Sequence, residues 1–137
     1  MHDLPRPDQL LAAVAGFLRQ EAGPALGRAG ESALAYQARV AANMLDIVAR
    51  QLTLAPAAEA AERARLQALL GAPQTDDLAA LNQRLAEALA AGTLDPATQP
   101  ALADHLWRTT LDKLAVDQPR YATYRQVVGE AAPPPGG

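Results

Sequence analysis

Four polar residues recur at helical spacing in an otherwise apolar stretch of the chain. They are Arg39, Asn43, Asp46 and Arg50. Spacings of three and four residues place them on one face of a helix. In one interpretation this face is a solvated stripe with an Asp46–Arg50 ion pair, which contributes little to stability. In the other, Arg39 and Asn43 are half exposed and hydrogen-bond a partner or another segment of the chain.

A second polar cluster lies near the C-terminus, where two tyrosines and two arginines fall within six residues. Both residue types are enriched at protein interfaces, and a guanidinium group also binds phosphate or carboxylate in a bidentate manner. Alternatively, the two tyrosines fold the terminal segment back onto the helices and the arginines cover them. From the two clusters together, the predicted partner-binding or ligand-binding residues are Arg39, Asn43, Arg50, Arg120, Tyr121, Tyr124 and Arg125.

The sequence offers no recognisable catalytic or metal-binding constellation. Its two histidines, His2 and His105, lack metal-ligand spacing, and cysteine is absent, which removes thiolate nucleophiles. Ser32 is the only serine and has no base near it in sequence. Residues 27–30 lack the lysine and the preceding strand of a phosphate-binding loop. We therefore expect no enzymatic activity, no metal and no cofactor, with His105 on the surface and Trp107 in the core.

The bulk composition limits the classes of partner. A chain of 137 residues suits one domain, and its 50% hydrophobic content is that of a globular protein. The net charge of −3 argues against nucleic acid as a partner. The N-terminus lacks the apolar core of a signal peptide, and no stretch is long and apolar enough to span a membrane. We expect a cytoplasmic, bacterial protein.

Apolar residues at helical spacing predict about five helices. The first ends at Gly23-Pro24, and residues 23–30 form a loop. The second, residues 31–54, is the longest; it lies at the centre and is buried on more than half of its circumference. Pro56 begins a third helix that ends near Leu70, since proline is a helix breaker. Thr75 or Asp76 caps the fourth, which ends at Gly92.

Pro100 opens a fifth helix that ends near Val116, and a short segment over residues 121–128 follows. The predicted fold is thus an all-α, single-domain bundle with a long central second helix and a short C-terminal segment. The domain covers residues 1–128. Residues 129–137, rich in proline and glycine, form a flexible tail.

Four stretches of the chain resemble a family of small bacterial helical proteins of unknown function. They are residues 6–18, 36–50, 59–71 and 111–125. Members of that family are typically encoded beside aminoglycoside-phosphotransferase-like kinases and acyl-CoA dehydrogenases. One departure is Gln118, which stands where the family has Asn, and this leaves the hydrogen bonding of that turn open.

The resemblance implies a non-catalytic accessory subunit of a phosphotransferase-fold kinase. Such kinases are associated with hydroxy acid catabolism, in which they phosphorylate the hydroxyl group of a hydroxyacyl-CoA before its elimination. The seven predicted site residues match characteristic positions of the family. Two alternatives remain open: a module that binds CoA or acyl-CoA through its Arg/Tyr cluster, and a homodimeric helical scaffold.

Overall fold

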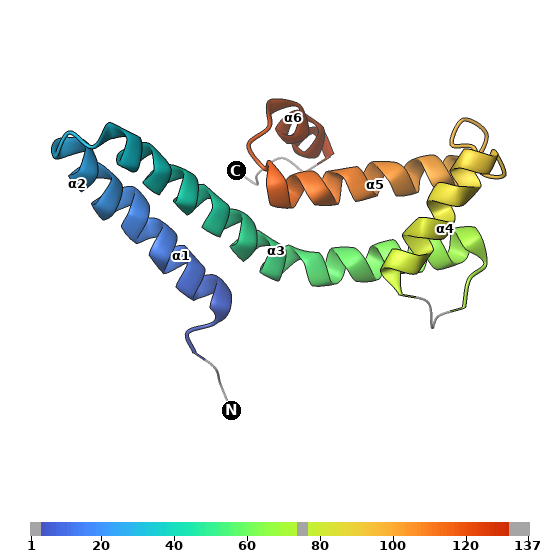
Figure 1. Ribbon diagram of the computed structural model, residues 1–137. Helices are drawn as coiled ribbons and strands as arrows, with labels where there is room; N and C mark the ends of the chain where they lie inside the picture. Colours follow the sequence, from blue (N-terminus) through green and yellow to red (C-terminus); the bar gives the residue numbers. More distant parts are fainter. Residues whose placement is uncertain (1–3, 74–76, 132–137) are drawn as a thin grey trace, which may run out of the picture. The chain divides into compact units, whose positions relative to one another are not determined.

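The computed structural model describes residues 4–73 and 77–131, and these are mainly helical (Figure 1). In chain order the elements are α1 (Pro7–Phe17), a π-helical turn η1 (Leu18–Ala22), α2 (Gly23–Arg28), α3 (Ser32–Leu70), α4 (Leu78–Ala91), α5 (Pro100–Asp117) and α6 (Ala122–Ala131). No strand occurs among the described residues. The all-α class, the long helix and the short C-terminal helix are confirmed.

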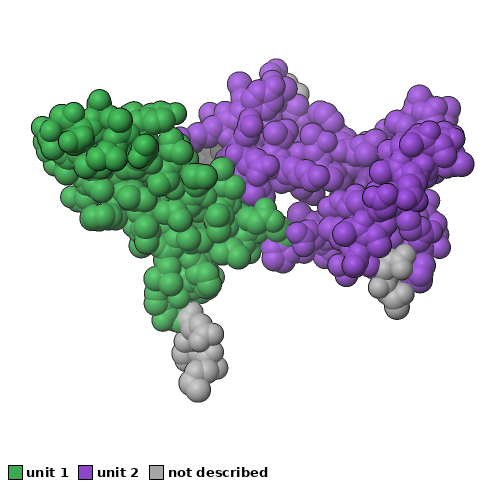
Figure 2. All heavy atoms as spheres, in the orientation of Figure 1, with its two compact units in different colours: residues 1–55 green, residues 56–137 purple. Residues whose placement is uncertain are grey.

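The chain divides into two compact units, residues 1–55 and 56–137 (Figure 2). The boundary falls within α3, so its N-terminal part belongs to the first unit and its C-terminal part to the second. The domain limits predicted from the sequence, 1–128 with a tail from 129, stay a prediction. α6 continues to Ala131, and the rest of that tail lies outside the described residues.

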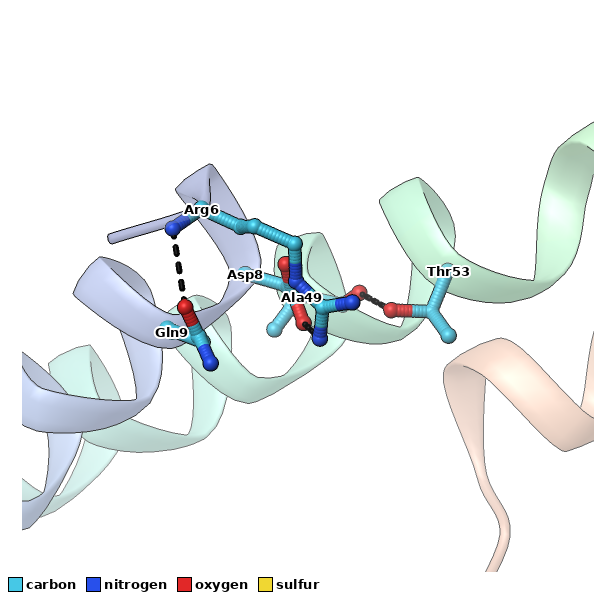
Figure 3. Close-up of polar contacts among 5 residues, drawn as sticks. All are labelled: Arg6, Asp8, Gln9, Ala49 and Thr53. Atoms are coloured by element: carbon cyan, nitrogen blue, oxygen red, sulfur yellow. Dashed lines mark hydrogen bonds and ion pairs between the residues drawn. The ribbon is translucent and has the colours of Figure 1, made fainter. Parts of the chain in front are cut away.

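α3 continues through Pro56, where the sequence predicted two separate helices. That prediction is wrong, because a proline removes one bond from the helical ladder and the neighbouring residues keep theirs. The missing N–H is the one that would bond to the carbonyl of Leu52. One turn earlier, Thr53 Oγ1 donates to the Ala49 carbonyl at 2.9 Å (Figure 3). A hydroxyl bonded in this way also loosens a helix locally.

The start of α1 agrees with the sequence. Pro7 is its first residue, a position at which no backbone N–H is needed. The Arg6 N–H donates to Gln9 Oε1 at 2.9 Å, and the Arg6 guanidinium pairs with Asp8 at 3.1 Å (Figure 3). These contacts hold the first turn.

In the first unit, α1 and the N-terminal part of α3 lie side by side and run in opposite directions (Figure 1). The buried residues of this unit are small: Ala15 of α1, Gly23 of α2, and Ala38 and Ala42 of α3. A Cβ on Gly23 would lie 2.9 Å from the Leu18 carbonyl oxygen, so only glycine fits there without a shift. We call these four residues the small-residue seam. Its residues let the two helices approach closely, since side-chain size sets the distance between helix axes.

Gly23 and Pro24 do not form the predicted loop. They open α2, and η1 connects this helix to α1 without an interruption. Pro24 lies in the first turn of α2, where its missing N–H has no partner to lose. The prediction that the helix stops at Gly23 is therefore wrong.

The core of the second unit is built from leucines of α3, α4 and α5. Leu66, Leu81, Leu85 and Leu102 are buried together. At the start of α4 the Asp77 side chain accepts a hydrogen bond from the Ala80 N–H at 2.7 Å; the predicted caps lie outside the described residues. Gly92 ends α4 with φ of 73°, as expected for a glycine in the left-handed region.

Candidate functional site

The polar face predicted on α3 is present and is linked to η1. Arg19 Nη2 donates to Asp46 Oδ2 at 2.8 Å and to Asn43 Oδ1 at 3.1 Å. Asp46 thus has a partner 27 residues away, which the local spacing could not indicate. Arg39 lies over the ring of Tyr36, with 5.9 Å from its Cζ to the ring centroid. Arg50 is half-buried and also takes part in a polar or electrostatic interaction.

A cavity of about 320 Å³ lies beside this polar face, within the first unit. It is lined by Arg19, Gly23, Pro24, Gly27, Ser32, Ala35 and Arg39. Two arginines and one serine are the polar residues of its wall. Of the predicted site residues only Arg39 lines it. Arg19, Ser32 and the glycines were not predicted, because their proximity depends on the antiparallel course of the chain.

The same helix pair also exposes large apolar residues outside the polar face. On α1 the exposed residues include Leu10, Val14 and Phe17, and on α3 they include Val40, Met44 and Val48. Phe17 is 59% exposed and Met44 is 62% exposed. We call these six residues the apolar face. The prediction that this helix is buried on more than half of its circumference is therefore wrong.

Helical geometry explains why the apolar face spans both helices. Successive residues are separated by about 100° around a helix axis. Met44 and Val48 therefore each lie about 160° around the axis of α3 from Asp46, the carboxylate to which Arg19 is bonded. In two antiparallel helices, Val14 of α1 then faces the same side as Met44. The small-residue seam buries only the narrow strip of each helix that faces the other helix.

The C-terminal cluster lies at the α5–α6 turn of the second unit. Arg120 and Arg125 are exposed, Tyr121 is 49% exposed and Tyr124 is half-buried. The Tyr121 N–H donates to the Gln118 carbonyl at 3.0 Å, which closes the turn. The structure thus brings the four residues of this cluster together and places them in a different unit from Arg39, Asn43 and Arg50.

The sequence predicted His105 on the surface and Trp107 in the core, and the structure shows the reverse. His105 is 1% exposed, whereas Trp107 is 53% exposed, so both sequence predictions are wrong. Arg65 Nε donates to His105 Nδ1 at 3.2 Å, and Arg65 Nη2 donates to Thr109 Oγ1 at 3.3 Å. Burial, followed by the positive charge of Arg65, lowers the pKa of His105 below 6.5. This cluster joins α3 to α5 in the second unit.

Most of the chain matches one known protein family. Residues 28–121 match the family described as a domain of unknown function, DUF6285. The chain belongs to this family. None of the curated proteins matches it, and no solved structure matches it.

The DUF6285 match includes part of each polar cluster. It contains Arg39, Asn43, Arg50, Arg120 and Tyr121, and it ends before Tyr124 and Arg125. Within the described residues, no group of three or more acidic, histidine or cysteine side chains could hold a metal ion. No described helix is both long and apolar enough to cross a bilayer.

Proposed function

We propose that this DUF6285 protein is a non-catalytic accessory subunit that binds a phosphotransferase-fold kinase acting on hydroxyacyl-CoA in hydroxy acid catabolism. The observation that carries the proposal is the apolar face. Six large apolar side chains on two adjacent helices stay exposed, and a concentration of exposed apolar residues is characteristic of an interaction site.

The chemistry of the apolar face suits a protein partner. It combines aliphatic side chains with Phe17 and Met44, and aromatic residues and methionine are enriched at protein interfaces. The partner is proposed to be a kinase because the family that four stretches of the chain resemble implies a phosphotransferase-like kinase encoded nearby.

The test is co-expression with a phosphotransferase-fold kinase of the kind that the resemblance implies, with an affinity tag after Gly137. Recovery of a stoichiometric complex, together with kinase turnover that depends on this protein, is the expected result. Met44→Lys should reduce recovery at least tenfold, because it places a charge in the apolar face. Gln20→Lys adds the same charge at an exposed residue of η1 outside that face and should leave recovery unchanged.

Two results would refute the proposal. In the first, the kinase and this protein elute separately, and the turnover rate of the kinase is the same with and without this protein. In the second, the Met44 and Gln20 variants behave alike, which would exclude the apolar face as the binding surface. A dimer in light scattering without kinase binding would instead favour the homodimeric scaffold.

A second candidate is direct binding of CoA or acyl-CoA by the C-terminal cluster. The supporting observation is the exposure of Arg120, Tyr121 and Arg125 at one turn, because guanidinium groups bind phosphates well. Isothermal titration calorimetry of the protein with CoA tests it. Binding that weakens in Arg120→Gln supports this candidate, and no heat at millimolar CoA rejects it.

A further inference from the structure

We infer that the cavity between η1, α2 and the start of α3 binds the phosphate or carboxylate group of a small organic anion, held by Arg39 and Arg19. None of the residues that line this cavity belongs to the apolar face. The inference therefore goes beyond the proposed function and does not depend on it.

The first argument is the charge of the wall. Arg39 has no carboxylate partner among residues 4–73 and 77–131, and its guanidinium group is placed over the ring of Tyr36. A cation on an aromatic face keeps its N–H donors at the edge of the guanidinium plane available. Arg39 thus brings to the cavity a positive charge that none of the described carboxylates pairs with.

Arg19 is held in place by its contacts with α3. Both of its hydrogen bonds, to Asn43 and to Asp46, come from Nη2. The Asp46 carboxylate offsets the charge of Arg19 but does not line the cavity. Arg19 can therefore donate further hydrogen bonds from Nε and Nη1 without losing its anchor. A guanidinium already fixed by other contacts loses less side-chain entropy on binding a ligand.

The start of α3 adds a third favourable feature. Ser32 is its first residue and lines the cavity. The Ala35 N–H bonds to the Glu31 carbonyl, so the N–H groups before it precede the helical ladder. The aligned peptide dipoles place partial positive charge at this end of the helix. Two guanidinium groups and a helix N-terminus thus favour the same sign of charge.

The size of the cavity favours an organic anion over a bare inorganic ion. A volume of about 320 Å³ is at the lower end of the range for small-molecule sites. The rest of the wall is formed by Gly23, Pro24, Gly27 and Ala35, which carry no charge. The anionic group would contact the arginines, and an apolar body of a few carbon atoms would contact these small residues.

The experiment is a titration of the whole chain followed by amide chemical shifts in NMR spectra. The probes are phenyl phosphate, benzoate and inorganic phosphate. We expect saturable shifts at η1 and the start of α3, with phenyl phosphate or benzoate binding more tightly than inorganic phosphate. The stronger of the first two identifies the anionic group as phosphate or carboxylate.

Two charge-matched variants locate the site. Arg39→Gln should weaken binding about tenfold, the effect of one charge-assisted hydrogen bond. Arg28→Gln removes the same charge from an exposed residue of α2 that does not line the cavity and should change affinity less than twofold. Equal weakening in both variants would indicate a general charge effect and overturn the inference. Linear, unsaturable shifts with all three probes would also overturn it.

Discussion

The Nε of Arg65 donates a hydrogen bond to Nδ1 of His105, so a residue of α3 fixes the protonation of a buried ring on α5. Because Nδ1 accepts, the neutral ring carries its proton on Nε2. A doubly protonated ring could not accept this bond and would face the positive charge of Arg65. The neutral form is therefore the one that fits the folded second unit.

Acid should destabilise the protein through His105. Burial and Arg65 lower the pKa of this residue below 6.5, although the charges of Glu62 and Asp104 oppose the shift. The unfolded chain then binds the proton more tightly than the folded one. The contribution of His105 to stability is fully present above about pH 6.5 and is lost as the pH falls through the folded-state pKa. Thermal melts between pH 7.5 and 5.0 should show a falling midpoint. His105→Gln should reduce that pH dependence; an identical slope in both proteins would contradict the assignment.

Removal of the Arg65 side chain should be costly. Arg65→Ala leaves Nδ1 of the buried His105 without a donor, and a buried unsatisfied group costs about 1–3 kcal/mol. Urea denaturation gives the free energy of unfolding. The control is Arg63→Ala, two residues away on the same helix but exposed, which should change it by about 0.5 kcal/mol or less. Equal effects at the two positions would show that the contact with His105 contributes nothing.

Two glycines of the first unit should respond in opposite ways to the same substitution. Gly23→Ala places a methyl group 2.9 Å from the Leu18 carbonyl oxygen and should lower stability. At Gly16 the new Cβ meets nothing within 4 Å, so Gly16→Ala should stabilise α1 by about 0.5–1 kcal/mol. Thermal unfolding followed by circular dichroism measures both. A stabilised Gly23→Ala variant would show that the small-residue seam tolerates a larger group.

Pro56→Ala should stabilise α3. The change restores a backbone N–H opposite the Leu52 carbonyl, and proline inside a helix costs about 3 kcal/mol relative to alanine. The greater freedom of the unfolded chain returns about 0.4–1 kcal/mol of this, so a net gain of about 2 kcal/mol is expected. The midpoint of urea unfolding should rise. A fall would mean that the proline ring makes packing contacts that outweigh the lost hydrogen bond.

Helix periodicity predicted most elements because it depends on local spacing alone. The stripe of Leu78, Leu81, Leu85 and Leu89 lies on α4, and Leu81 and Leu85 are buried as an amphipathic helix requires. Proline and glycine were less informative. Pro100 begins a helix, whereas Pro56 lies within one, and only the packing of the surrounding residues distinguishes the two cases.

Burial was harder to predict than helicity. Apolar spacing indicates which side of a helix can be buried, but the amount buried depends on what packs against it. Met44 is exposed because α1 packs against a different side of α3, where the buried residues are alanines. His105 is buried because Arg65, 40 residues earlier, supplies its donor. Arg19 was likewise not predicted to line the cavity, because its proximity to Arg39 depends on tertiary packing and not on the residues next to it in sequence.

The small-residue seam has a consequence for how the native chain opens. Each buried methylene contributes about 0.8 kcal/mol, so contacts between alanine and glycine stabilise a helix pair far less than the buried leucines of α4 and α5. Local opening of α1 should therefore need less free energy than opening of the second unit. The amide hydrogens of α1 would exchange with solvent deuterium first, and a molecule that binds the helix pair would slow them more than any others in the protein.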